Sequence, residues 1–408
     1  MIFGLDPMLS GHLDWGVFGI VVLKTVLVFV FLLVATMFMV WFERKIIGDM
    51  QNRLGPNRAG PYGLLQTLAD GTKLLFKEDL VPARADRVAF AIAPMLALFP
   101  AFLTFSVIPI GGLFNDSHGG LVSIFGHYTR LQLADPPIGF LMVLAMTSIA
   151  VYGVILAGWA SGSKYPLLGS VRATAQMVSY EAAMGLSVAA IFLVTAGQAN
   201  GIRALETSSI VFAQHTWHWN LWITGIVPAV IFLLAGTAEI ERPPFDLLEA
   251  EQELVAGFNT EYSSFRFALF YLASFMNSVT FAAVLTTLFL GGPSGPSFGP
   301  EFLKVWILPV VWFFAKVLVL LYGFVWVRAT LPRFRYDQLM DLGWKVLIPL
   351  SLGWLLLLIG VRVGHDRNWN VALVILVGVV VLLAGYAALA AANRVARTHR
   401  LEHEEAFE

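Results

Sequence analysis

An all-α polytopic membrane protein with about nine transmembrane helices is the fold that the sequence predicts. Of its 408 residues, 58% are hydrophobic and 13% are charged. Soluble domains carry about 25% charged residues, so roughly half of the usual charge is missing here. The apolar residues gather in runs of about 20 residues, the length that a bilayer-crossing helix needs. Strands of a membrane barrel would be about ten residues long with alternating polarity, which excludes that class.

The apolar runs give the expected spans in chain order. Seven of them are long enough to cross the bilayer by themselves: 16–41, 88–110, 138–160, 221–238, 267–290, 302–327 and 371–392. Two shorter runs, 182–197 and 346–361, need flanking residues to reach across. We expect a membrane domain over 1–362, an extra C-terminal helix over 363–393 and a charged tail over 394–408.

The basic residues predict how these spans are oriented. Connections that would share one face hold 19 of the 26 Lys and Arg residues, and those on the other face hold five. Cytoplasmic loops of membrane proteins are the ones enriched in Lys and Arg. The sequence therefore predicts a multi-pass protein with its N-terminus outside and its C-terminus in the cytoplasm.

Several kinds of chemistry find no suitable residues. Because there is no cysteine, the chain can form no disulfide and no thiolate-held iron–sulfur cluster. None of the eight histidines falls inside a span, which argues against an intramembrane haem, and His215 and His218 lack a third metal ligand nearby. The 26 basic and 27 acidic residues leave no basic excess for a nucleic-acid partner. We therefore expect no metal and no redox cofactor in this chain.

The first connection on the basic face contains two candidate features. Glu43, Arg44 and Lys45 end the first span, and an interfacial anchor is the simpler interpretation of such a trio. Within 62–79, polar side chains recur at helical spacing opposite leucines, which predicts an amphipathic helix too polar to span. Such a helix lies along the membrane surface. It is either a plain anchor or the wall of a cavity that opens to the bilayer.

Carboxylates mark two further segments on the same face. Glu181 begins the short fourth run, and a carboxylate at membrane depth is a functional candidate because burying its charge is costly. The alternative is a position just outside the hydrocarbon. The segment 238–262 holds seven acids and one base, Arg242. Crowded carboxylates raise one another's pKa values, as a proton relay requires. An acidic loop that docks a basic partner would have the same composition.

The last connection on this face, 327–345, carries four basic residues, among them Arg328. Positive-inside topology is sufficient to explain them. The alternatives are a basic patch for a partner or an arginine that lines a quinone or carboxylate site.

Four sequence blocks lie on these connections in a fixed order. They read ERKIIGDMQNRLGPNRAGPYGLLQTLADGTKLLFKED, KYPLLGSVRATAQMVSYE, AEIERPPFDLLEAEQELVAGFNTEY and PRFRYDQLM. Through these blocks the chain resembles the NADH dehydrogenase subunit 1 family of respiratory complex I, known as the H subunit in bacterial NADH:quinone oxidoreductase. The resemblance covers roughly residues 15–362. It implies a bacterial cytoplasmic-membrane protein that anchors the iron–sulfur arm to the membrane arm and takes part in proton translocation.

The resemblance also implies roles for particular residues. It implies that the first span, the amphipathic helix and the sixth span frame the access route of a quinone, either menaquinone or ubiquinone. The implied partners are the iron–sulfur subunits of the quinone site and small membrane subunits. The residues expected at the quinone chamber are Arg44, Arg53, Phe245 and Arg328. Those expected to couple proton transfer are Glu43, Asp70, Glu181, Glu239, Glu249, Glu251 and Glu253.

The chain departs from the family pattern at two places. After the GFNTEY motif, family members often carry a glutamate, whereas this chain has Ala273, Ser274 and Phe275. Serine does not titrate, so one acidic step is absent or is replaced by water or another acid. The family usually has eight spans, and 371–392 would be a ninth.

Two other functions fit parts of the sequence. A stand-alone proton- or cation-coupled transporter would use Lys24 and Lys316, which lie within spans, and would need no partner. A purely structural anchor would use the acidic segment only for docking, so neutralising its charges would damage assembly and not turnover. No convincing internal repeat supports the transporter hypothesis.

Overall fold

The computed structural model describes residues 6, 14–114, 119–124, 126–198, 204–214, 217–246 and 255–405. Over these residues the chain is mainly helical, which confirms the all-α prediction. Within these described ranges, eight helices are long and apolar enough to cross a membrane. Their bounds are α1 (Trp15–Met50), α3 (Arg87–Ser106), α4 (Gly139–Ala160), α5 (Lys164–Gln198), α10 (Ser264–Phe289), α11 (Leu308–Thr330), α13 (Ile348–Asp366) and α14 (Val371–Glu405).

The remaining expected span is shorter than the others. It is α8 (Ile226–Glu239), of 14 residues, which follows the single turn of α7 (Asn220–Ile223). Two spans are extended by π-helical turns. A π-helix, η4 (Leu303–Ile307), leads into α11, and α12 (Tyr336–Asp341) continues through the π-helix η5 (Leu342–Leu347) into α13. The eight long helices and α8 thus occupy the nine predicted positions.

Helix α5 begins much earlier than the apolar run that predicted it. It starts at Lys164 and continues for 35 residues, so the expected connection before 182–197 is mostly helical. Pro166 lies in its first turn, where the missing N–H breaks no intrahelical hydrogen bond. Glu181 is therefore in the middle of a continuous helix and not at the start of one.

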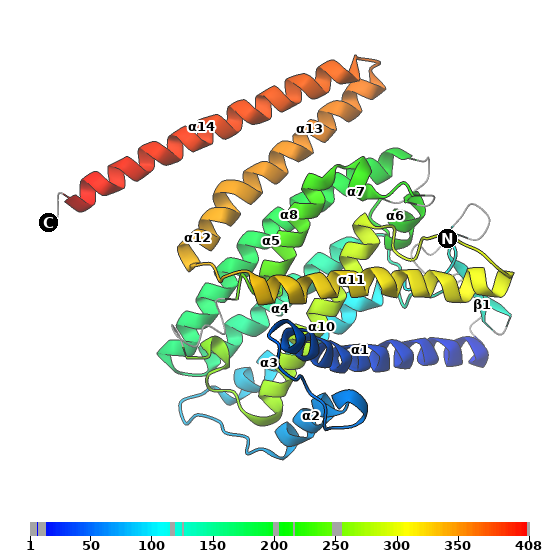
Figure 1. Cartoon of the computed structure of the whole chain (residues 1–408), viewed down its shortest axis with the longest axis vertical. Coiled ribbons are helices and arrows are strands. Elements are labelled where there is room, and N and C mark those ends of the chain that lie inside the picture. The colour runs from blue at the N-terminus through cyan, green and yellow to red at the C-terminus, as the bar shows by residue number, and fades with distance from the viewer. Residues whose placement is uncertain are drawn as a thin grey trace.

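A short antiparallel hairpin lies in the connection between the expected spans 88–110 and 138–160. Strands β1 (Leu121–Ile124) and β2 (His127–Arg130) pair with Leu121 opposite Arg130. Four residues per strand are too few for a clear alternating pattern, so periodicity gave no signal. Figure 1 shows β1 at the same end of the molecule as the start of α1. Short helical segments α6 (Thr207–Ala213) and η3 (Gly257–Asn259) complete the connections.

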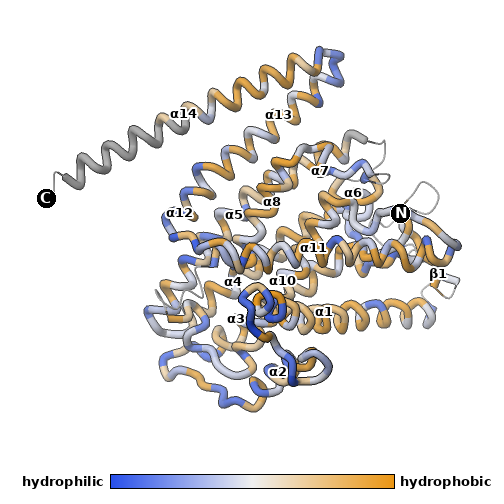
Figure 2. Tube along the Cα trace, in the orientation of Figure 1, coloured by the Kyte–Doolittle hydropathy of each residue, from blue (hydrophilic) through white to orange (hydrophobic). Residues whose placement is uncertain are grey.

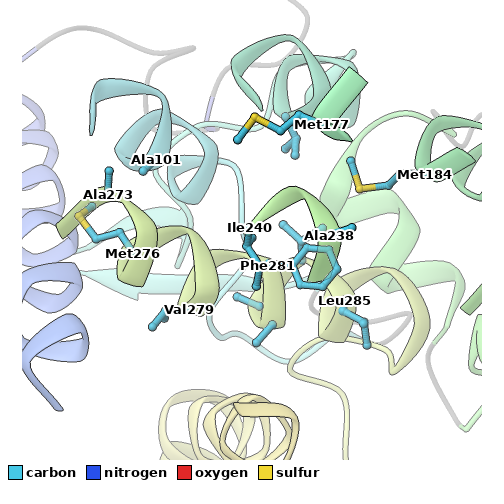
Figure 3. Packing of buried hydrophobic residues seen from close by; sticks show 14 of the residues in the cluster. Ala101, Met177, Met184, Ala238, Ile240, Ala273, Met276, Val279, Phe281 and Leu285 are labelled. Carbon is cyan, nitrogen blue, oxygen red and sulfur yellow. The ribbon is translucent and has the colours of Figure 1, made fainter. Parts of the chain in front are cut away.

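Helix α10 is the centre of the apolar core. Of an apolar stretch of 18 consecutive residues in this helix, 72% are buried. This is the largest share among the eight helices that could span a membrane. Figure 3 shows Met276 and Phe281 of α10 among Met177, Ala238 and Ile240 from neighbouring segments. Small residues allow this close packing in a membrane protein. Gly236 of α8 is an example, because a Cβ there would lie 1.8 Å from the Phe281 ring.

The predicted amphipathic helix is α2 (Gln66–Phe76), shorter than the expected 62–79. It follows a 3-10 turn (η2, Pro61–Gly63) and has no buried residue. Its apolar side chains are exposed, up to 91% for Phe76. Helix α2 contacts α1 and α10, and Figure 2 shows polar residues gathered around it. This arrangement agrees with a helix that lies on the bundle surface.

The last helix, α14, stands apart from the bundle. Its neighbour is α13, with which it forms the hairpin seen in Figure 1. Glycines mediate the contact, since Gly364 meets Val374 and Gly378 meets Leu357. None of its 18-residue apolar window is buried. Helix α14 therefore adds surface to the molecule and almost no core.

Candidate functional site

A buried carboxylate paired with two arginines lies at the end of α1. The Glu43 side chain is 9% exposed, and Arg242 Nη1 donates to its Oε2 over 3.3 Å. Arg328 Nη1, from the end of α11, donates to its Oε1. The guanidinium of Arg242 also stacks 4.0 Å from the Phe275 ring centroid. Three distant parts of the chain thus meet in one group of net positive charge, the Glu43 cluster (Glu43, Arg242 and Arg328).

The segment after α8 is held in place by a buried glutamine. Gln176 Nε2 donates to Ala238 O (2.7 Å) and to Phe245 O (3.0 Å), on either side of the cis Pro243–Pro244 bond. Asp246, 2% exposed, is 3.5 Å from Arg333. These contacts fix the backbone that presents Arg242 to Glu43.

Two further carboxylates lie inside the helical bundle. Ser148 of α4 donates a hydrogen bond to Glu181 of α5. Glu239, the last residue of α8, interacts with Glu181 and with Thr147 of α4. In the described part of the chain, Glu239 Oε2 is buried and has no hydrogen-bond partner. Two carboxylates within reach of each other and of hydroxyl groups are able to exchange a proton through water.

Two adjoining cavities run beside these groups. The larger one, of about 150 Å³, is lined by Glu239, Arg242, Asp246 and Arg328 among others. The smaller one, of about 60 Å³, is lined by Thr147, Glu239 and Thr280. Residues that line both are Ala150, Met177, Glu239, Ile240 and Asn277. We refer to these two cavities together as the inner cavity, which has polar atoms along an otherwise apolar wall.

A third cavity, the portal cavity, lies between α1, α2 and α10. It measures about 400 Å³ and is lined by apolar residues such as Val40, Leu68, Leu75 and Leu269. Leu68 and Leu75 are more than half exposed, so the mouth of the cavity presents an apolar surface. The volume is in the range of sites that hold drug-sized ligands.

An ion pair and a tyrosine stand where the portal cavity approaches the inner cavity. Arg44 Nη1 donates to Asp70 Oδ2 over 2.7 Å, joining α1 to α2. Tyr271 of α10 interacts with Arg44 and lines both the portal cavity and the larger part of the inner cavity. Trp41 Nε1 gives a second contact between α1 and the α2 side, donating to Tyr62 O over 3.0 Å.

The structure brings together most of the predicted site residues that it describes. Arg44 and Asp70 meet at the portal cavity, Glu43 and Arg328 in the Glu43 cluster, and Glu181 and Glu239 beside the inner cavity. The three acids Glu249, Glu251 and Glu253 lie outside the described residues.

Two predicted chamber residues are placed away from the cavities. Arg53 is exposed, and its Nε donates to Gln51 Oε1 over 2.7 Å. Phe245 is 1% exposed and packs its ring on Phe334 and Tyr180, at centroid distances of 5.4 and 5.7 Å. In this arrangement Phe245 is a packing residue that secures the loop after α8.

The sequence interpretation gave no site role to several residues that line the cavities. Tyr271, Ser274 and Asn277 of α10 all face the larger part of the inner cavity. Their spacing of three residues marks a polar stripe on an otherwise apolar helix, and this signal could have identified them. Arg242 was noted as the one base in an acidic segment but was not named as a site residue.

Similarity to known proteins identifies the family of this chain. A family model described as NADH dehydrogenase matches residues 23–359. The chain belongs to the NADH dehydrogenase family. A relative in Frankia alni, named as the H subunit of NADH-quinone oxidoreductase, is 49% identical over 93% of this chain and 82% of its own length. A relative of the same name in Streptomyces avermitilis is 47% identical over 94% and 80%. A third, in Frankia casuarinae, is 48% identical over 93% and 82%.

Family membership establishes the broad role of the chain. It is a multi-pass membrane subunit of an NADH-quinone oxidoreductase complex, and thus part of an oxidoreductase. Other subunits of that complex are its partners. The relatives are named as subunits of a complex, and this argues against a stand-alone transporter.

Proposed function

We propose that this member of the NADH dehydrogenase family admits a quinone from the bilayer and forms part of the chamber in which it is reduced. The observation that carries the proposal is the portal cavity, an apolar space of about 400 Å³ with exposed leucines at its mouth. A quinone with an isoprenoid tail is a substrate that resides in lipid, so an apolar lateral opening suits its access.

The inner end of this route is suited to a polar headgroup. Beyond Tyr271 the lining changes from leucines to Arg242 and Arg328. Guanidinium groups donate hydrogen bonds to carbonyl oxygens and stabilise the negative charge that reduction adds. In this proposal the electrons come from iron–sulfur subunits of the peripheral arm, and this chain, which has no cysteine, would hold no thiolate-bound cluster itself.

The carboxylates beside the inner cavity are proposed to couple this reduction to proton translocation. A change of charge near Arg242 and Glu43 alters the proton affinity of neighbouring acids, by about 1.4 kcal/mol for each pKa unit. Glu239 and Glu181 offer two exchange positions in the bundle. Buried Glu239 Oε2 and Thr280 Oγ1, for which the described residues supply no hydrogen-bond partner, suit bound water. Glu249, Glu251 and Glu253 would supply protons from the solvent side.

The setting of the protein follows from the same proposal. The N-terminus lies outside a bacterial cytoplasmic membrane, and the cytoplasmic connections face the iron–sulfur subunits. The quinone is menaquinone or ubiquinone. Small membrane subunits cover part of the remaining lipid-facing surface.

A cavity-filling substitution tests the access route. Ala268 of α10 lines the portal cavity. In the assembled complex, Ala268→Phe should raise the KM for a long-tailed quinone severalfold, while NADH oxidation by a water-soluble acceptor stays unchanged. Ala384→Phe, at an exposed position of α14, adds the same bulk elsewhere and serves as the control. Equal quinone kinetics for both variants would contradict the proposed route.

The acidic segment is tested by triple substitution. Glu249, Glu251 and Glu253 replaced together by Gln should lower proton pumping and quinone reduction while the complex remains assembled. Full pumping by this variant would refute the relay. Loss of assembly with normal turnover per assembled complex would favour a docking role instead.

A further inference from the structure

A separate cavity lies at the opposite end of the bundle from the Glu43 cluster. It measures about 290 Å³ and is bounded by residues 112–114, the loop 293–297 and the beginning of α11. Trp312 lines it, and Arg328 of the Glu43 cluster is sixteen residues further along the same helix. At 1.5 Å per residue this places the two sites roughly 24 Å apart. The cavity therefore has no part in the quinone route.

A partly buried lysine fixes one wall of this cavity. Lys316 of α11 directs its ammonium group at the loop that follows α10. Its Nζ donates to the carbonyl oxygens of Leu290 (2.7 Å), Gly292 (2.9 Å) and Ser294 (2.7 Å). The same Nζ lies 5.1 Å from the ring centroid of Trp219. These contacts hold the loop and one indole in position without any ligand.

A tryptophan fixes the opposite wall. Trp312 Nε1 donates to Pro296 O over 3.0 Å. A Cβ on Gly295 would lie 2.6 Å from the Trp312 ring, so the loop backbone rests directly on the indole. Both walls are thus held by protein contacts, as in a preorganised binding site.

The composition of the lining indicates the depth of the cavity in the membrane. Three tryptophans line it, namely Trp217, Trp219 and Trp312. Trp312 is close to the first turn of a spanning helix, and Trp217 is 64% exposed. Tryptophans concentrate where the hydrocarbon meets the lipid headgroups. The cavity is therefore at headgroup level on the side of the membrane where α11 begins.

One charged side chain of the lining adds a specific contact. Lys304 lines the cavity from η4, a π-helical segment. π-Helical turns are rare and occur frequently at functional sites. An ammonium group at headgroup level complements the phosphodiester that every glycerophospholipid carries.

We propose that this cavity binds a phospholipid of the leaflet on this side, with its phosphodiester at Lys304 and its glycerol region against Trp217 and Trp312. Free phosphate shares the chemistry of the Lys304 contact but not that of the tryptophans. The bound lipid would fill the space between the loop 293–297 and α11.

A photoreactive phospholipid tests the proposal in the intact complex. The probe is a phosphatidylethanolamine with a diazirine next to the glycerol ester, mixed into nanodiscs that hold the complex. Peptides containing Trp312 or the loop 293–297 should be labelled. Lys304→Gln should reduce this labelling about fivefold, the size of one lost charge contact at a partly exposed site. Lys304→Arg keeps the charge and should keep the labelling.

Controls separate the lipid site from other outcomes. Trp222→Leu removes an exposed tryptophan that does not line the cavity and should change nothing. Trp312→Leu should abolish the labelling, and NADH:quinone reductase activity reports whether the complex is intact. Labelling that is equal in the wild type and in Lys304→Gln and Trp312→Leu would overturn the proposal. Displacement of the probe by inorganic phosphate alone would replace it with a simple anion site.

Discussion

Glu43 and Arg44 are neighbours on α1 and yet belong to different environments. A helix turns about 100° per residue, so one side chain faces the bundle and the other faces α2. Glu43 is buried between two arginines, whereas the Arg44 side chain is 44% exposed and pairs with Asp70 at the portal cavity. One short motif thus takes part in two kinds of ion pair. A buried pair is costly to break, and an exposed pair contributes little to stability.

The largest effect is expected at the buried member. Glu43→Gln leaves Arg242 and Arg328 without their carboxylate, and breaking a buried ion pair costs about 3–5 kcal/mol. We expect little assembled complex, measured by native electrophoresis of detergent-extracted membranes. Glu43→Asp keeps the charge and should restore much of the assembly. Normal assembly of the Gln variant would show that the Glu43 cluster is not what secures this end of α1.

Glu239 tests whether buried acids beside the inner cavity act in proton transfer. Glu239→Gln preserves the shape of the side chain, so the complex should assemble. We expect proton translocation to fall about 100-fold, the lower range for loss of a positioned proton-transfer group. A pH-sensitive dye in proteoliposomes measures the pumping, with NADH oxidation followed in parallel. Glu78→Gln, at an exposed position, is the control. Unchanged pumping in Glu239→Gln would exclude this residue from the relay.

The exposed pair should give a smaller and purely kinetic effect. Arg44→Gln or Asp70→Asn removes a contact worth about 0.2–1 kcal/mol, so we expect up to about a fivefold change in the KM for quinone. Assembly should be normal. Arg362→Gln breaks an exposed pair with Asp366 on α13 and should leave the KM unchanged. A loss of assembly as large as that of Glu43→Gln would remove the distinction between the two pairs.

Substitutions at Thr280 test whether its hydroxyl binds water in the smaller part of the inner cavity or only fills space there. The hydroxyl is buried, and its Oγ1 has no hydrogen-bond partner among the described residues. Thr280→Val keeps the shape, so stability should change by no more than about 1 kcal/mol. If the hydroxyl holds water next to Glu239, pumping should decrease while assembly and NADH oxidation by a soluble acceptor remain normal. Thr280→Ser retains the hydroxyl and should pump like the wild type.

The smallest effect is expected from removal of α14. Its apolar window has no buried residue, and its neighbour is α13. Truncation after Arg367 should leave assembly and quinone reduction as they are, measured on the purified complex. A truncated chain that failed to assemble would show that another component of the complex depends on this helix.

Much of the fold could be predicted from the sequence because hydrophobic length alone identifies a spanning helix. The features that the sequence did not predict are local ones. The start of α5 was missed because polar residues such as Gln176 and Ser179 interrupt the hydropathy, although both are buried against other segments. The hairpin β1–β2 was missed because it is too short for periodicity.

The candidate site was predictable by residue type and less so by pairing. The sequence and its family resemblance identified Glu43, Arg44, Asp70 and Arg328 as functional candidates, but their partners lie on other segments of the chain. Phe245 shows the same limit, because nothing in the RPPFDL motif indicates that its ring packs on Phe334 and not in a cavity. Which carboxylate meets which arginine is decided by tertiary packing, and that information is absent from local spacing.

The lipid-facing mouth of the portal cavity also has a consequence for enzyme kinetics. With a route of this kind, the substrate is drawn from the bilayer, so the aqueous concentration does not set the rate. The relevant quantity is the mole fraction of quinone among the lipids. Adding quinone-free lipid at a constant total amount of quinone should then slow turnover as dilution does in solution. Under the proposed route, the lipid content therefore belongs to the rate law as much as the amount of quinone supplied.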